Sequence, residues 1–264
     1  MSEAPRIIAI ANQKGGVGKT TTAINLAAAL AERGHSTLLV DLDPQGNAST
    51  GLGIDASART LTTFDLLLER TPLADVVHKT SIERLSVCPA NADLSSADME
   101  LLTNEKRSGL LREALRDPSA DAYEYILIDC PPSLSLLTIN ALVAADSVLV
   151  PLQAEFFALE GLSQLMLTVR EVRQTANPTL RIEGVALTMY DKRNNLSQLV
   201  ENDARQTLGE LVFGTIIPRN VRVSEAPSFA IPVLTYDTTS KGSEAYRALA
   251  VEMLGRHRQM RKSA

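Results

Sequence analysis

The chain has 264 residues, of which 45% are hydrophobic and 22% are charged, and its formal net charge is −5. This length and composition are typical of a globular protein with a sizeable core, and the acidic balance excludes a protein that is basic as a whole. Any DNA binding would therefore have to come from a local basic patch.

Strand-like apolar runs alternate with helical patterns along the chain. Strands are expected at residues 6–11, 37–40, 85–88, 125–128, 147–150, 182–187 and 214–217. Helices are expected at residues 20–33, 63–70, 105–115, 135–145, 159–175, 196–208 and 243–256. This alternation, with strands that are apolar along their length, predicts an α/β fold: a mostly parallel twisted sheet with helices on both faces. No linker interrupts the pattern, so we predict one domain over residues 1–264.

A glycine-rich loop follows the first expected strand and leads directly into a helix. Residues 13–20 read QKGGVGKT. Glycines let the backbone turn tightly, so that its N–H groups and the positive helix N-terminus converge on phosphate oxygens. Lys19 would reach the β- and γ-phosphates of ATP, and the Thr20 hydroxyl would ligate Mg²⁺. The usual pattern is G-x-x-x-x-G-K-[ST], but here Gln13 replaces the first glycine and Lys14 is an additional lysine.

Aspartates stand at the ends of two expected strands. Asp41 comes directly after the second expected strand, residues 37–40, and Asp43 lies two residues further on. Asp129 comes directly after another expected strand, residues 125–128. In an open α/β sheet the carboxyl ends of the strands face the ligand crevice. Asp41 and Asp43 are two residues apart and would point the same way on an extended chain, so one could support Mg²⁺ while the other orients the attacking water. Asp129 fits a Walker B residue that supports Mg²⁺.

Together these patterns resemble the ParA/Soj partitioning ATPases, which belong to the deviant Walker A (MinD/ParA) superfamily of P-loop NTPases. The resemblance covers nearly the whole chain. It is carried by residues 11–22, 40–47, 128–133, 157–162, 187–191, 217–222 and 224–228.

The resemblance implies roles that spacing alone does not show. Lys14 resembles the signature lysine that crosses a dimer interface to the partner's phosphates, and Asp43 the residue that activates the hydrolytic water, with Asp41 in support. The expected catalytic residues are Lys14, Lys19 and Asp43, and the expected metal site is Thr20, Asp41 and Asp129. The expected nucleotide contacts are Lys14, Gly15, Gly16, Val17, Gly18, Lys19, Thr20 and Thr21, with Met189, Pro218 and Asn220 around the adenine.

The resemblance also implies partners. An ATP-bound homodimer would bind nonspecific double-stranded DNA through Arg193 and Arg222, and a ParB-type centromere-binding protein would stimulate slow hydrolysis and release it. We therefore expect a nucleoid-associated, cytoplasmic protein without stable membrane association. Cys88 and Cys130 lie in apolar stretches, as buried thiols of a reducing compartment do, and no apolar run approaches the roughly 20 residues that span a bilayer.

Other functions remain open at this stage. A MinD-like ATPase would bind membrane through a C-terminal amphipathic helix, but the apolar stripe of residues 246–254 is expected to pack on the sheet. A carboxylase-type ligase with a similar loop would need a second polar pocket, and a DNA-bound ATPase could position another cargo. Chromosomal and plasmid cargo are not distinguished. His35, His78 and His257 have no partners at metal or catalytic spacing and receive no role, and neither do residues 55–103.

Overall fold

A computed structural model of the chain describes residues 4–102, 107–155 and 158–263. Within them, the strands are β1 (Arg6–Ile10), β2 (Thr37–Asp41), β3 (His78–Lys79), β4 (Leu85–Cys88), β5 (Tyr125–Asp129), β6 (Ser147–Gln153) and β7 (Arg181–Thr188). They form one sheet in the order β3-β4-β2-β5-β1-β6-β7. All neighbours pair in parallel except β3 and β4, which form an antiparallel edge.

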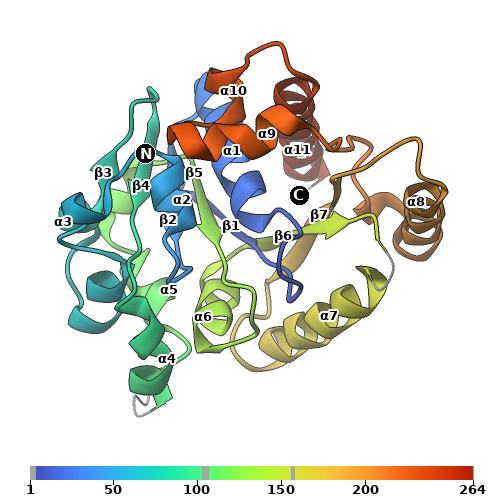
Figure 1. Ribbon diagram of the computed structural model, residues 1–264. Coiled ribbons are helices and arrows are strands. Elements are labelled where there is room, and N and C mark those ends of the chain that lie inside the picture. The colour runs from blue at the N-terminus through green and yellow to red at the C-terminus, as the bar shows by residue number, and fades with distance from the viewer. Residues whose placement is uncertain (1–3, 103–106, 156–157, 264) are drawn as a thin grey trace.

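Helices cover both faces of this sheet (Figure 1). They are α1 (Lys19–Glu32), α2 (Asn47–Gly51), α3 (Leu73–Val76), α4 (Leu94–Leu102), α5 (Leu110–Ala114), α6 (Leu136–Ala144), α7 (Ala158–Thr175), α8 (Asn195–Leu208), α9 (Val221–Glu225), α10 (Val233–Tyr236) and α11 (Lys241–Ser263).

The alternation of side chains along each strand explains the two layers. In β1, Ile8 and Ile10 pack with α1, α10 and α11, whereas Ala9 packs with α4, α5, α6 and α7 on the opposite face. Successive side chains of a strand point to opposite faces, so a strand covered on both sides must be apolar throughout. The predicted fold class is confirmed.

One predicted strand is wrong. The structure has no strand at residues 214–217. Val212 and Pro218, on either side of them, form isolated bridges with Val185 and Tyr190, and the N–H of Ile217 donates to the carbonyl of Leu187 at 2.8 Å. The carboxylate of Glu252 in α11 accepts hydrogen bonds from the backbone N–H groups of Gly214 and Thr215, both at 2.8 Å. Because these donors are used by a side chain, the segment does not join the β-ladder.

The remaining predictions differ mainly at their boundaries. The pattern at residues 63–70 forms a π-helical turn, Asp65–Glu69, in place of an α-helix. The predicted helix 105–115 is shorter in the structure, as α5, and its first two residues lie outside the described ones, as does Phe157 of the family motif. The short helices α2, α3, α4, α9 and α10 were not predicted.

The C-terminal helix α11 packs along α1 on one face of the sheet (Figure 1). Its apolar stripe is buried, as predicted, at Tyr246, Leu249, Ala250, Met253 and Leu254. Among the described residues, no helix combines the length and the apolar character needed to cross a membrane.

Candidate nucleotide-binding site

The loop between β1 and α1 has the backbone geometry of a phosphate cradle. Gly16 and Gly18 have φ angles of 74° and 87°, in the left-handed region that glycine adopts without strain. Gly18 is also the N-cap of α1, so the first N–H groups of the helix open toward the loop. The Thr188 hydroxyl donates to the carbonyl of Val17 at 2.8 Å and ties the loop to the end of β7.

The side chain of Lys19 is buried and forms a hydrogen bond with the backbone of this loop. Its Nζ donates a hydrogen bond to the carbonyl oxygen of Lys14 at 3.1 Å, and the residue is only 6% exposed. Burial lowers the pKa of Lys19, while the carboxylate of Asp129 acts in the opposite direction. A buried lysine in this position places its charge where the phosphates of a nucleotide would lie.

Asp129, the last residue of β5, is fully buried and lacks ordinary partners. Neither carboxylate oxygen has a hydrogen bond of normal geometry within the described residues. Burial, followed by the neighbouring charge of Asp41, raises the pKa of Asp129 well above its ordinary value, although the Thr20 hydroxyl and Lys19 act against this. A buried carboxylate is unfavourable unless a cation or a donor satisfies it.

This arrangement fits a magnesium ion. An unpaired carboxylate, Asp129, lies beside the hydroxyl of Thr20 at the start of α1. Within the described residues, no group of three or more His, Cys, Asp or Glu side chains could hold a metal by itself. Mg²⁺ suits such a site, because it usually keeps several waters and substrate oxygens and takes only one or two protein ligands.

Asp41, at the end of β2, is fully engaged with its own chain. One oxygen accepts from the N–H and the hydroxyl of Ser49 in α2, at 2.8 and 2.6 Å, and the other accepts from the N–H of Asp43 at 3.2 Å. Burial raises the pKa of Asp41 to about 6, against the effect of these hydrogen bonds. The visible contacts of Asp41 therefore position α2 and the Asp43 turn, and its expected part in the metal site stays a prediction.

Asp43 lies in the turn after β2 and is 7% exposed. Its carboxylate accepts from the N–H of Gln45 at 2.9 Å, which fixes the turn. The charge of Asp43 contributes to the pKa shifts of both Asp129 and Lys19, so the three side chains form one cluster. The structure thus brings the carboxyl ends of β2 and β5 to the phosphate loop.

Two of the expected adenine contacts also lie together. Tyr190 forms a β-bridge with Pro218, which holds the segments of Met189 and Pro218 side by side. Met189 has a φ of 50°, and its Cε lies 3.6 Å from where a Cβ on Gly18 would be. Met189 is therefore at the edge of the phosphate loop.

Asn220 has a visible structural role. Its side-chain oxygen accepts from the N–H groups of Arg222 and Val223, at 2.9 and 3.3 Å, and so caps α9. This cap is two residues beyond Pro218, and an adenine contact by Asn220 stays a prediction.

Sequence reasoning missed two residues that support the site. Ser49 binds Asp41, and its hydroxyl also accepts from the N–H of Ala90 at 2.9 Å. Arg59, in the region left without a role, donates to Thr50 of α2 and to the carbonyl of Ala90. Neither residue belongs to a motif, and the signal available in the sequence was only their place shortly after Asp41.

Comparisons with known proteins establish the family. A family profile described as an AAA domain matches residues 5–182. The chain is 56% identical to the chromosome partitioning protein ParA of Caulobacter vibrioides (strain NA1000 / CB15N), over 98% of this chain and 97% of that protein. It is 50% identical to the sporulation initiation inhibitor protein Soj of Bacillus subtilis (strain 168), over 94% and 98%. The chain belongs to the ParA/Soj family.

A solved structure with a similar fold contains a bound nucleotide and magnesium. Cobyrinic acid a,c-diamide synthase from Mycobacterium smegmatis, with bound ADP and magnesium, has a TM-score of 0.82 and 38% identity, covering 95% of this chain and 94% of that one. The prediction of ATP with Mg²⁺ is thus confirmed for this fold, and metal binding by Asp129 and Thr20 stays a prediction.

The additional lysine of the loop, Lys14, has a partly exposed side chain that forms an ion pair. The Nζ of Lys14 lies 3.6 Å from a carboxylate oxygen of Glu155, and its side chain is 36% exposed. Lys19 is buried in the same loop, so the two lysines have different environments.

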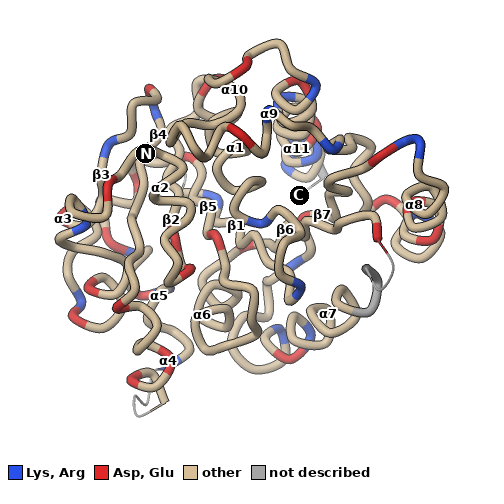
Figure 2. Tube along the Cα trace, viewed as in Figure 1, with Lys and Arg blue, Asp and Glu red and all other residues tan. Residues whose placement is uncertain are grey.

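The two arginines expected to contact DNA in a ParA/Soj protein are both at the surface. Arg193 precedes α8, is 90% exposed at its side chain and pairs with Asp191 at 3.0 Å. Arg222 in α9 pairs with Glu225 and Asp237 at 2.9 and 3.3 Å. Figure 2 shows basic segments at the start of α8 and around α9, beside acidic ones.

Proposed function

We propose that the protein is an ATP-dependent DNA-partitioning ATPase, whose ATP-bound homodimer binds nonspecific DNA and is released by slow, partner-stimulated hydrolysis. The observation that carries this proposal is the buried carboxylate of Asp129, whose oxygens have no hydrogen bond of normal geometry within the described residues and which lies beside Lys19 and the phosphate loop. A nucleotide with its metal ion would satisfy all of these charges together.

The cluster suggests how hydrolysis would proceed. Bound Mg²⁺ would neutralise charge on the β- and γ-phosphates, and Lys19 would bind the same phosphates. Asp43 would orient the attacking water, because the hydrogen bond from Gln45 and the engagement of Asp41 fix its turn at the mouth of the loop. With only such positioning groups and no arginine finger evident near the loop, intrinsic turnover should be slow.

Lys14 provides the link between ATP and the dimer. In the free chain Lys14 forms an ion pair with Glu155, a partly exposed contact that costs little to break. If Lys14 instead reaches the phosphates of a second chain, ATP is shared by two subunits and favours the dimer. Loss of the γ-phosphate would then weaken the dimer.

DNA binding would follow from dimerisation. Arg193 and Arg222 are exposed and paired only with surface carboxylates, so DNA phosphates can compete for them. Such contacts are blind to sequence and weaken as salt increases. A dimer presents each arginine twice, which raises the affinity without any new contact.

The proposal is tested by co-sedimentation with nonspecific duplex DNA in ATP, ADP or no nucleotide, at two salt concentrations, beside anionic liposomes. We expect retention on DNA only with ATP, weakened by salt and lost in Arg222→Glu. Arg170→Glu, an exposed arginine of α7, is the matched charge reversal and should bind normally. Lys14→Gln should stay monomeric in ATP and fail to bind DNA.

Two other outcomes would replace the proposal. Binding to liposomes rather than DNA would indicate a membrane-positioning ATPase of the MinD type. ATP-dependent DNA binding that no ParB-type protein reverses would indicate an ATPase that positions another cargo on the nucleoid.

A further inference from the structure

The opposite end of the sheet contains a recess of about 820 Å³. It lies where β1, β5 and β7 begin and where α11 ends, and it is lined at these points by Arg6, Tyr125, Arg181 and His257. The nucleotide site is at the carboxyl ends of the same strands, so the recess is a separate place in the fold.

The strand register gathers these side chains on one face. Arg6 is opposite Tyr125, and Arg181 is opposite Ser147, which in turn is opposite Ile8. Residues opposite one another in parallel strands share a face, and so do residues two apart in one strand. Arg6 and Arg181 therefore both emerge on the face covered by α11, on either side of β6 and about 10 Å apart across the sheet.

The wall of the recess is a rigid network of buried polar groups. His257 of α11 lies 2.6 Å from Glu183 of β7, and the Ser147 hydroxyl donates to the other oxygen of Glu183 at 2.6 Å. The Tyr125 hydroxyl lies 3.3 Å from the second nitrogen of His257. These groups satisfy one another and hold α11 against the strands.

Two guanidinium nitrogens in the recess are not satisfied. Nη1 of Arg6 and Nε of Arg181 are buried, and neither has a hydrogen-bond acceptor within the described residues. A buried charged donor without an acceptor is unfavourable, and each of these belongs to a different strand. Both arginines line the recess, so an acceptor that enters it would lie beside the same two guanidinium groups.

Two of the carboxylates that line the recess already have other partners. Asp146 accepts from the N–H of Ile7 at 2.8 Å, and Glu124 accepts from His35 at 2.7 Å. Arg258, exposed on α11, adds a further positive charge to the lining. Asp121 is a third carboxylate in the lining. The recess therefore offers arginine donors to an incoming anion, and two of its three lining carboxylates have other partners.

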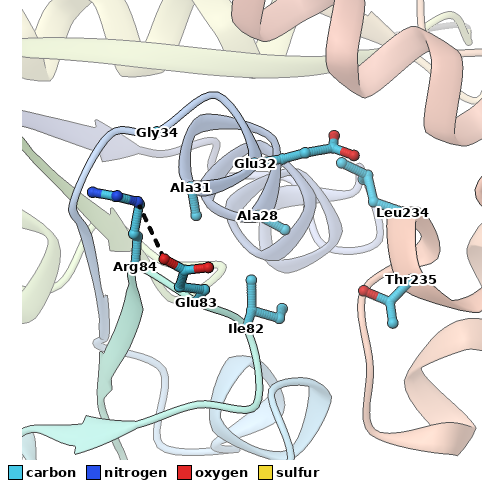
Figure 3. A pocket seen from close by; sticks show the side chains of 9 residues that line it. All are labelled: Ala28, Ala31, Glu32, Gly34, Ile82, Glu83, Arg84, Leu234 and Thr235. Atoms are coloured by element: carbon cyan, nitrogen blue, oxygen red, sulfur yellow. Dashed lines mark ion pairs between the residues drawn. The ribbon is translucent and has the colours of Figure 1, made fainter.

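A comparison with another pocket shows that an arginine in a pocket wall is not by itself evidence for an anion site. The pocket between α1, α10 and the turn before β4 has a volume of about 270 Å³ (Figure 3). Its arginine, Arg84, is 52% exposed at the side chain and pairs with Glu83 at 3.7 Å. Water can satisfy such a side chain, so this pocket makes no demand for an anion.

We propose that the recess between Arg6 and Arg181 binds a small phosphate-bearing anion. Arginine forks match phosphate oxygens with several hydrogen bonds at once, and two forks on separate strands can hold one phosphate from both sides. The ligand is a small molecule because the donors are buried inside a recess rather than displayed on a surface.

The test is a calorimetric titration with inorganic phosphate at constant ionic strength, in excess ADP and Mg²⁺ so that the phosphate loop is filled. Arg6→Gln and Arg181→Gln should each weaken phosphate binding by about tenfold or more, as expected for the loss of a charged hydrogen-bond donor. Arg84→Gln, from the pocket of Figure 3, should leave it unchanged. Equal binding by all four proteins would overturn the proposal.

A local readout on the unaltered protein covers the case in which a variant does not fold. Phosphate should shift the ring signals of Tyr125 and His257 in an NMR titration, and a lack of any shift would contradict the site. A short DNA duplex is the competing source of phosphates. If the duplex shifts these signals and free phosphate does not, the ligand is a nucleic acid and the proposal of a small anion is wrong.

Discussion

The two ends of the sheet bury charge in opposite ways. At the amino end, Glu183 is buried with His257 and Ser147, and both oxygens of its carboxylate have a partner. At the carboxyl end, Asp129 is equally buried, yet neither of its oxygens has a hydrogen bond of normal geometry to any residue that the structure describes. The same sheet thus carries a carboxylate on β7 that the fold satisfies and a carboxylate on β5 that the fold leaves for a ligand.

The pKa directions follow this difference. Burial alone would raise the pKa of Glu183, but the hydrogen bonds and charge of His257 outweigh it, and the net shift is downward. Burial also raises the pKa of Asp129, and there the charge of Asp41 adds to the effect. A paired buried charge stabilises the fold that surrounds it, whereas an unpaired one costs stability that a ligand can restore.

The largest effect on the free energy of unfolding is expected at the amino end of the sheet, where the carboxylate of Glu183 is paired. Glu183→Ala should lower the free energy of unfolding by about 3–5 kcal/mol, because His257 and Ser147 lose a buried partner. Since the folded pKa of Glu183 is depressed, its contribution is present above the unfolded value and is lost as pH falls. The gap between the variant and the parent protein should therefore narrow toward pH 4 in urea denaturation.

The matched control for this change is Glu171→Ala, an exposed glutamate of α7, which should alter stability by less than about 0.5 kcal/mol. An equal loss in both variants would mean that the Glu183 network is no more important than a surface carboxylate.

At the ligand end, Lys19→Ala should reduce ATP hydrolysis by about 100-fold or more, because it removes a charge aimed at the phosphates. Phosphate release at saturating ATP and Mg²⁺ measures this. Lys241→Ala, an exposed lysine of α11, is the control. Normal turnover in Lys19→Ala would exclude the glycine-rich loop as the site of the reaction.

The sequence predicted the ligand end far better than the amino end, for a physical reason. The phosphate loop and the aspartates are local patterns attached to buried strands, and periodicity locates those strands. His257 and Glu183 are 74 residues apart, and no local pattern links them, so the histidine received no role. The segment 214–217 has a strand-like sequence, but Glu252, a distant side chain, takes its donors.

Removing the carboxylate of Asp129 is expected to increase the free energy of unfolding, whereas removing that of Glu183 is expected to decrease it. Asp129→Asn should abolish hydrolysis but increase the free energy of unfolding of the nucleotide-free protein by about 1–3 kcal/mol at neutral pH, because a buried charge is removed. The folded pKa of Asp129 is raised, so the parent protein loses stability as pH rises above the unfolded value of the carboxyl. The advantage of the variant should thus disappear toward pH 4.

Asp203→Asn, an exposed position in α8, should show neither the gain nor its dependence on pH. Destabilisation of Asp129→Asn at neutral pH would mean that the carboxylate is satisfied in the free protein, and the contrast between the two ends would fail.

The smallest effects on the free energy of unfolding are expected for substitutions of two arginines, Arg59 and Arg181. Arg59 donates to the carbonyls of Ile54 and Ala90 and to the Thr50 hydroxyl, at distances of 2.7 to 3.1 Å. Arg59→Lys keeps the charge but loses the fork, and it should lower the free energy of unfolding by about 1–2 kcal/mol. Arg181→Lys removes the Nε that has no acceptor, and without a ligand it should cost less than about 0.5 kcal/mol. Denaturation midpoints in chloride and in phosphate separate the two, because only Arg181→Lys should reduce the stabilisation that phosphate gives. If both variants lose the same stability in chloride, the Arg181 nitrogen already has a partner, and the amino end is closed rather than open to an anion.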